Sequence, residues 1–257
     1  MLNTFLYNSL FIFLAKLKIT HERFKMIPKI IHYIWFGNTQ NNITKKSINT
    51  WEKRAPEYKI IEWNEDNLPN YSNTFYQQAL ANKDYAFASD YARLRILQQY
   101  GGVYMDTDMY LLKDPYKTLI NKELAFSIQD PNVIISTSFI AACPDQEFIN
   151  EAIKLYENIP YKFGKNKPNT EVLSPLLFAM YNFNHSTETQ QRGKVTAFEP
   201  DIFLQPSFKT VALHIGEKVW AHHTTHDKLR IKAREHITNQ FSAGIFRIAN
   251  DFFRKII

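Results

Sequence analysis

The chain has 257 residues, of which 45% are hydrophobic, so it can bury one large core. Its net charge of +6 indicates an anionic partner, such as a phosphorylated substrate or a lipid surface. Nucleic acid is not expected, because the lysines are scattered and there is neither an arginine-rich arm nor a zinc-finger cysteine set. The single cysteine, Cys143, excludes an intramolecular disulfide framework and is compatible with the cytoplasm.

The amino-terminal segment contains an apolar run at residues 10–17 (LFIFLAKL), which Lys16 interrupts. A membrane-spanning helix needs about 20 consecutive apolar residues. A secretory signal would place positive charge before the run, whereas here the lysines follow it. We therefore expect residues 1–25 to be an extension or a short apolar docking helix, with a membrane-contacting segment as the alternative. The compact domain is expected to cover residues 26–240.

From residue 30 onward, strand-like and helix-like segments alternate. Residues 30–35 (IIHYIW) form a continuous apolar run typical of a buried strand. A helix is predicted over 43–55, ending before Pro56, and a second strand over 58–63. After a turn-rich stretch at 64–73, residues 84–100 show helical spacing of apolar residues and stop at Gly101.

The next predicted elements are strands at 103–106, 124–128 and 133–142 and a helix at 145–157. This alternation, without any repeat period, predicts an α/β fold with a largely parallel central sheet. Ligands of such sheets bind beyond the carboxyl ends of the strands. Both the end of the run at 30–35 and the triplet Asp106-Thr107-Asp108 fall there.

Asp106 and Asp108 are the candidate metal ligands. If strand geometry continues to Asp108, both side chains leave the same face, with α carbons about 6–7 Å apart. Carboxylates in this arrangement suit Mg²⁺ or Mn²⁺, which are commonly completed by substrate phosphates. The alternative is an exposed acidic pair at a strand end.

Further candidates lie elsewhere in the chain. Asp90 and Arg93 share a helix face, where a carboxylate can accept from sugar hydroxyls and a guanidinium can bind phosphate; a surface salt bridge is the alternative. Trp35 can stack on a nucleobase or fill the core. A late cluster of His222, His223 and His226 offers an imidazole to a metal.

Four segments, in this order, resemble the DXD-motif sugar-transferase family: IPKIIHYIWFG (27–37), SINTWEKRAPEYKIIEWNEDN (47–67), YAFASDYARLRILQQYGGVYMDTDMYLLKD (85–114) and, more loosely, VWAHH (219–223). This family, of the glycosyltransferase family 32 type, includes yeast outer-chain mannosyltransferases, α-1,4-galactosyltransferases and bacterial capsular-polysaccharide enzymes. The resemblance implies a GT-A fold, a nucleotide-sugar donor, a Mn²⁺ or Mg²⁺ ion and transfer with retention at the anomeric carbon.

By position, the resemblance assigns Asp106 and Asp108 to the metal and diphosphate, and His222 to the metal. The family often follows its late histidines with a small-polar-aromatic ending, but this chain has Thr-Thr-His-Asp, which leaves His223 and His226 as alternatives to His222.

The same resemblance implies that Asp90 and Arg93 contact the donor sugar and that Arg93 is also catalytic. It implies that Trp35 lies beside the nucleobase of the donor.

The carboxyl-terminal segment 241–257 is predicted to be a basic amphipathic helix. Apolar residues recur there at helical spacing, with Arg247, Arg254 and Lys255 between them. Such a helix can lie on an anionic membrane surface or pack its apolar face on the domain, and both remain open.

The family resemblance implies a metal-dependent, retaining hexosyltransferase, and we favour a UDP-sugar over a GDP-sugar as its donor. Its acceptor would be a glycan or lipid-linked molecule of capsule or lipopolysaccharide synthesis, and its location cytoplasmic, with peripheral contact to the inner membrane face. The alternatives are an inactive binding protein of the same fold and a metal-dependent hydrolase. A glycoside hydrolase fits less well, because it needs carboxyls about 5–9 Å apart on opposite sides of the scissile bond.

Overall fold

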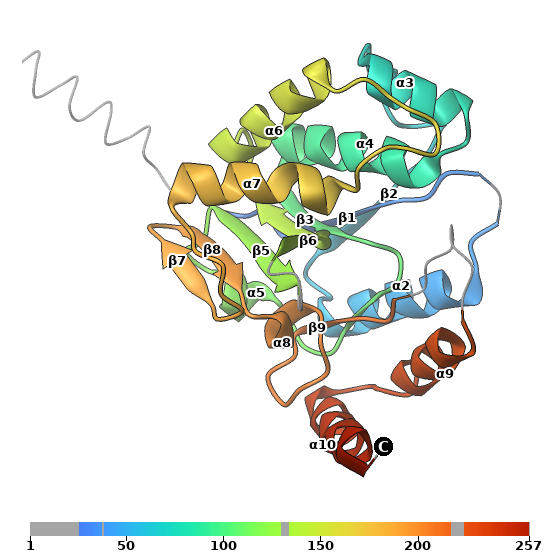
Figure 1. The fold of residues 1–257 in the computed structure, drawn as a ribbon, viewed down its shortest axis with the longest axis vertical. Coiled ribbons are helices and arrows are strands. Elements are labelled where there is room, and N and C mark those ends of the chain that lie inside the picture. The colour runs from blue at the N-terminus through green and yellow to red at the C-terminus, as the bar shows by residue number, and fades with distance from the viewer. Residues whose placement is uncertain (1–25, 38, 130–133, 217–223, 257) are drawn as a thin grey trace, which may run out of the picture.

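The structure is a computed structural model that describes residues 26–37, 39–129, 134–216 and 224–256. A central sheet separates two layers of helices (Figure 1). The segments predicted at residues 1–25 and at His222 and His223 lie outside the described residues.

The central sheet has seven strands in the order β2-β1-β3-β6-β5-β8-β7. Their bounds are Ile30–Ile34 (β1), Lys59–Trp63 (β2), Gly102–Met105 (β3), Leu124–Gln129 (β5), Ile134–Ala142 (β6), Gln190–Arg192 (β7) and Val195–Phe198 (β8). The pairings β1–β2, β1–β3 and β5–β8 are parallel, and β6 and β7 each run antiparallel to their neighbours. Five strands therefore point one way and two the other, which confirms an α/β fold with a mostly parallel sheet.

One face of the sheet is covered by α3 (Thr74–Ala81), α4 (Tyr85–Tyr100), α6 (Glu147–Asn158) and α7 (Asn169–Tyr181) (Figure 1). Apolar side chains of these helices and of the sheet form one continuous core cluster. The helices predicted at 84–100 and 145–157 are confirmed as α4 and α6. Helices α3 and α7 were not predicted: Asn73, in the stretch interpreted as turns, caps α3 by accepting from the Tyr76 amide at 2.9 Å, and α7 contains Pro175.

The other face carries α2 (Asn42–Arg54), α5 (Tyr116–Leu119), α8 (Pro200–Phe203) and a small sheet of β4 (Met109–Leu111) and β9 (Ala212–His214). A second core cluster joins these elements to the sheet, with Trp51 of α2 fully buried at its centre. The indole nitrogen of Trp51 donates to the Met109 carbonyl at 2.7 Å. Helix α2, predicted at 43–55, is thereby tied to the strand that follows the aspartate triplet.

Two consecutive glycines connect α4 to β3 and set the position of that triplet. Gly101 and Gly102 have φ of 60° and 98°, a region that side chains disfavour. A Cβ on Gly101 would lie 2.6 Å from Cδ of Pro144, and one on Gly102 would lie 2.7 Å from the Ile30 carbonyl oxygen. No larger residue fits here, so β3 pairs with β1 directly after the helix ends.

A buried histidine stabilises the same junction. The His32 Nε2–H donates to the Gly101 carbonyl at 2.8 Å, while its Nδ1 accepts from the Trp63 indole at 3.0 Å. Burial lowers the pKa of His32 to about 4, so the ring is neutral, as this pair of bonds requires.

The chain ends in α9 (Thr225–Arg234) and α10 (Gln240–Ile256), at the bottom of Figure 1. Thr224 and Asp227 form a capping box at the start of α9. The helix predicted at 241–257 is present as α10. Among the described residues, no helix has both the length and the apolar character to cross a bilayer.

Candidate active site

The Asp-Thr-Asp triplet forms a turn between the two sheets. Asp106 follows β3 of the central sheet, its amide donating to the Ser138 carbonyl at 2.9 Å, and β4 of the small sheet begins at Met109. The Met109 amide donates back to the Asp106 carbonyl at 3.1 Å, which closes the turn. The strand therefore does not continue to Asp108, and the same-face geometry based on such a strand is wrong.

Asp106 stands on the central-sheet side of this turn, with one third of its side chain exposed. Its Oδ1 accepts from the Tyr104 hydroxyl at 3.0 Å and from Nη1 of Arg93 at 3.2 Å. Its Oδ2 has no hydrogen-bond partner among the described residues.

Arg93 is buried beneath Asp106, and each of its guanidinium nitrogens has a protein partner. Nε donates to the Ser89 carbonyl at 3.1 Å, Nη2 to the Ser89 hydroxyl at 2.9 Å, and Nη1 to the Thr137 carbonyl at 2.8 Å. The guanidinium also lies 4.5 Å from the ring centroid of Tyr104. Burial alone would lower the pKa of Arg93, but the neighbouring Tyr104, Asp106 and Asp90 raise it, so the cation is secure.

Asp90 completes this buried group as the second carboxylate beside Arg93. Its Oδ1 lies 3.0 Å from Nη2 of Arg93, in the predicted i,i+3 spacing. The pair is not the surface salt bridge named as the alternative, since Asp90 is only 8% exposed and Arg93 only 4%. Burial raises the pKa of Asp90 to about 7, although Arg93 opposes that rise.

Asp108 lies on the other side of the turn, against β9. Its Oδ2 accepts from the Gly216 amide at 3.1 Å and lies 3.2 Å from Nε2 of His214. Burial would lower the pKa of His214, but Asp108, with a smaller contribution from Asp106, raises it overall. Only 9% of the Asp108 side chain is exposed, and its Oδ1 has no hydrogen-bond partner among the described residues.

His214 was missed by the sequence interpretation. It ends β9, a strand of three residues in a region where no element was predicted. Its signal was a short apolar run, Val-Ala-Leu, that ends in a histidine shortly before Gly216. Pairing of β9 with β4, with His214 opposite Met109, brings it to the aspartate turn.

Trp35 follows β1 directly, and β1 is the parallel neighbour of β3, which Asp106 follows. The two residues thus leave adjacent strands at the same edge of the sheet. The indole is partly buried and packs on the core cluster that contains Trp51. Its role beside a nucleobase stays a prediction.

The aspartate pair has the donor chemistry for Mg²⁺ or Mn²⁺. Each carboxylate keeps one oxygen without a protein partner in the described part of the chain, and oxygen ligands of this kind suit both cations. Within that part, no three His, Cys, Asp or Glu side chains are already gathered as a complete shell. His226 is the second residue of α9, whereas the predicted ligand His222 lies outside the described residues.

Comparisons with known proteins point to glycosyltransferases. Residues 41–126 match the family described as "Glycosyltransferase sugar-binding region containing DXD motif". The chain is 24% identical over 164 residues to inositol phosphoceramide mannosyltransferase 1 of Schizosaccharomyces pombe, covering 61% of this chain and 51% of that protein. It is 35% identical over 130 residues to toxin A of Clostridium novyi, covering 51% of this chain and 6% of the toxin. The chain thus spans about half of one curated relative and a small part of the other.

Among solved structures, the PaToxG glycosyltransferase superposes with a TM-score of 0.50 at 22% identity. The match covers 61% of this chain and 70% of that one. It supports the GT-A fold that the family resemblance implies.

Proposed function

Because the chain carries the DXD-containing sugar-binding region of glycosyltransferases on a GT-A fold, we propose that it transfers a hexose from a nucleotide sugar to an acceptor hydroxyl. The observation that carries the proposal is the turn that holds Asp106 and Asp108 at the edge of the sheet. Each of these carboxylates is anchored through one oxygen and has the other available.

In the proposed reaction, the bond from the anomeric carbon to the diphosphate oxygen breaks while the acceptor oxygen bonds to that carbon. Negative charge develops on the departing diphosphate, which takes the acceptor's proton in a retaining transfer. A Mn²⁺ or Mg²⁺ ion held by Asp106 and Asp108 would supply Lewis-acid stabilisation of that charge. His222, with His223 and His226 as its alternatives, and His214 are the candidates for a further ligand.

Arg93 supports this site from beneath. Since all three of its nitrogens are engaged by the protein, we assign it to positioning Asp106 and balancing its charge. Asp90 lies 3.0 Å from Nη2 of Arg93 and remains a candidate contact of the donor sugar.

The proposed donor is a UDP-sugar, with a GDP-sugar second. Trp35 offers an indole face to either base at the edge where Asp106 lies. The proposed acceptor is a glycan or lipid-linked molecule of capsule or lipopolysaccharide synthesis, and the proposed place of action is the cytoplasmic face of the membrane.

The test is a panel of UDP- and GDP-sugars with Mn²⁺ or Mg²⁺, scored for release of the nucleotide diphosphate with and without a chelator. We expect release with one donor, lost on chelation and lost in Asp108→Asn. Release from no donor would support the inactive binding protein. Sugar release from a glycoside without nucleotide would support the hydrolase instead.

A further inference from the structure

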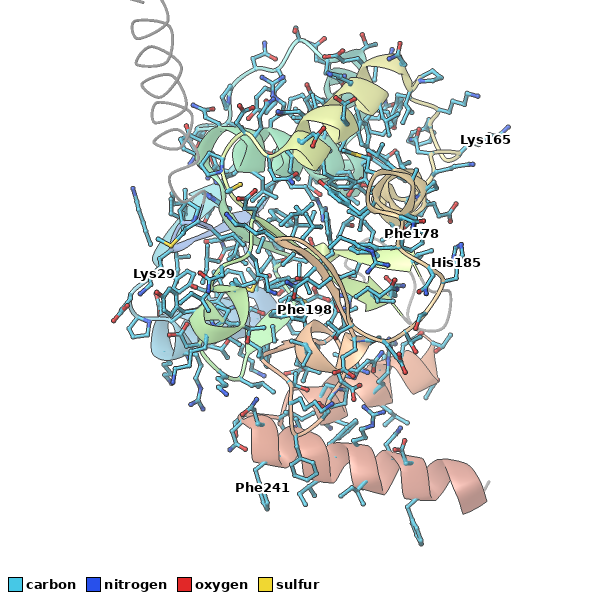
Figure 2. The ribbon with its side chains drawn as sticks, turned by 90° about the vertical axis from the view of Figure 1, so that its left-hand side faces the viewer. Lys29, Lys165, Phe178, His185, Phe198 and Phe241 are labelled. Atoms are coloured by element: carbon cyan, nitrogen blue, oxygen red, sulfur yellow. The ribbon has the colours of Figure 1, made fainter. Side chains whose placement is uncertain are left out.

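Helix α10 presents a stripe of large apolar side chains to solvent. Phe241, Ile245, Ile248 and Phe252 recur at helical spacing and are 70%, 49%, 58% and 62% exposed. Figure 2 shows Phe241 pointing away from the rest of the molecule. The sequence interpretation left open whether this apolar face packs on the domain, and these four side chains remain about half exposed or more. Contiguous exposed apolar surface of this kind marks an interaction site.

Residues of α10 outside the stripe fix the helix to the domain. Ala243 is fully buried, and a Cβ on Gly244 would lie 2.3 Å from the ring of Phe208, so the ring rests directly on the helix backbone. Arg247 forms an ion pair with Asp201 of α8. Helix α10 is therefore packed on the domain, and the stripe faces solvent while the helix is in its packed position.

Phe208 extends the stripe onto the catalytic domain. It is 52% exposed, and its ring centroid is 6.3 Å from that of Phe241. It lies in the loop between α8 and β9, six positions before His214. The apolar surface and the aspartate turn are consequently linked by one short strand.

Charge at this end of the molecule indicates what covers the stripe. Residues 225–257 contain seven Lys or Arg and three Asp or Glu, a net charge of +4 out of the chain's +6. A second copy docking through the same stripe would bring two such segments together, and like charges oppose that contact. An anionic lipid surface attracts the basic segment and accepts the apolar one.

We infer that α10 and Phe208 form a docking surface for anionic membranes, with Phe241, Ile245, Ile248 and Phe252 entering the lipid interface. Docking through Phe208 places the loop that leads to His214 at the membrane. Resting on the proposed function, this assigns the acceptor to the lipid-linked class, because its head group would be delivered beside the aspartate turn.

The test is co-sedimentation of the full chain with vesicles of phosphatidylcholine mixed with phosphatidylglycerol, against vesicles of phosphatidylcholine alone. Phe241→Ser has a matched control in Phe163→Ser: Phe163 is 69% exposed and lies in the loop between α6 and α7, at the opposite end of the molecule. We expect Phe241→Ser with Ile248→Ser to lower partitioning into the mixed vesicles by about ten-fold or more, and Phe163→Ser to leave it unchanged.

Two further arms separate the outcomes. Raising the ionic strength to about 1 M, where the screening length is about 3 Å, should weaken binding to the mixed vesicles. Equal loss in the Phe163 control, or an Ile248-dependent dimer without vesicles, would overturn the inference. Donor hydrolysis in solution should be unchanged in the stripe variants. Absence of donor hydrolysis would therefore contradict the proposed function, whereas absence of vesicle binding would contradict the docking surface.

Discussion

Helices α4 and α10 violate the usual burial pattern in opposite ways. Helix α4 buries an aspartate and an arginine, and α10 exposes two phenylalanines and two isoleucines. Buried charges and exposed apolar stripes are both uncommon, so each is informative. In α4 the cost of burying Arg93 is offset by partners on each of its nitrogens. In α10 the four side chains of the stripe remain about half exposed or more.

The two helices therefore differ in where their unusual side chains find partners: those of α4 within the protein, and those of α10 at its surface. The charges of α4 are satisfied within the protein. They support the turn where Asp106 and Asp108 each keep one oxygen without a hydrogen-bond partner among the described residues. The stripe of α10 remains about half exposed or more at each of its four side chains, so it suits a large apolar surface.

The largest expected effect is on the aspartate turn. Asp108→Asn should lower turnover about 10³-fold while leaving the fold intact, because an amide is a poor ligand for a hard cation. Nucleotide diphosphate release and circular dichroism measure both quantities. Asp114→Asn, an exposed residue whose carboxylate accepts from the Tyr116 amide at 2.8 Å, is the control and should retain activity. Full activity with unchanged metal dependence in Asp108→Asn would refute the metal site.

The next effect tests whether α4 depends on its buried charges. Arg93→Met should lower the free energy of unfolding by about 3–5 kcal/mol, because Asp106 loses its buried cationic partner and the groups around Arg93 lose their hydrogen bonds. Arg95→Met, on the same helix, removes only a bond to the Tyr91 hydroxyl at 3.3 Å and a contact with the Tyr71 ring, and should cost about 1 kcal/mol or less. Denaturant titration compares the two, and equal losses would show that Arg93 has no special structural role.

A smaller effect sharpens the account of Asp90. Its pKa rises from 3.8 to about 7 on folding, so the folded chain keeps a proton that the unfolded chain has released. This contribution to stability is present below the lower pKa and is lost as pH rises through the upper one. Asp90→Asn should therefore gain stability relative to the original chain between about pH 4 and about pH 8. If Asp90→Asn instead loses free energy of unfolding relative to the original chain over that pH interval, the ionised carboxylate is the stabilising form.

The smallest expected effect on stability is in the apolar stripe of α10. Phe241→Ser should change the free energy of unfolding by no more than about 0.5 kcal/mol, because its side chain is 70% exposed. Thermal or chemical unfolding measures this directly, beside the loss of vesicle binding. Destabilisation comparable to that of Arg93→Met would place the stripe in the core instead.

Much of the fold was predictable from local pattern. Apolar runs identified β1, β2 and β3, and Gly101 marked the end of α4, because strand burial and helix termination are encoded in neighbouring residues. Helix α7 was not predicted, because Pro175 disfavours a helix locally. The packing of this helix on the sheet outweighs that local preference. Strands β4 and β9 have three residues each, too few to show any period.

Within the candidate site, the residues of one continuous segment could be named and their arrangement could not. Asp90, Arg93, Asp106 and Asp108 lie within nineteen positions of one another, so a motif contains them all. The bond from Arg93 to Asp106 depends on how α4 packs on β3. The contact from His214 to Asp108 joins residues more than a hundred positions apart, through the pairing of β4 with β9.

Residue order therefore sufficed for the α/β architecture, the aspartate pair and the helical character of residues 241–257, since each depends on spacing along a few turns or strands. Three-dimensional packing decided the rest. It determined which face of α10 is buried, which oxygen of each aspartate accepts a hydrogen bond, and that the salt bridge of α4 is buried. Burial and hydrogen-bond partnership are properties of contacts between distant segments, and these contacts exist only once the sheets and helices have assembled.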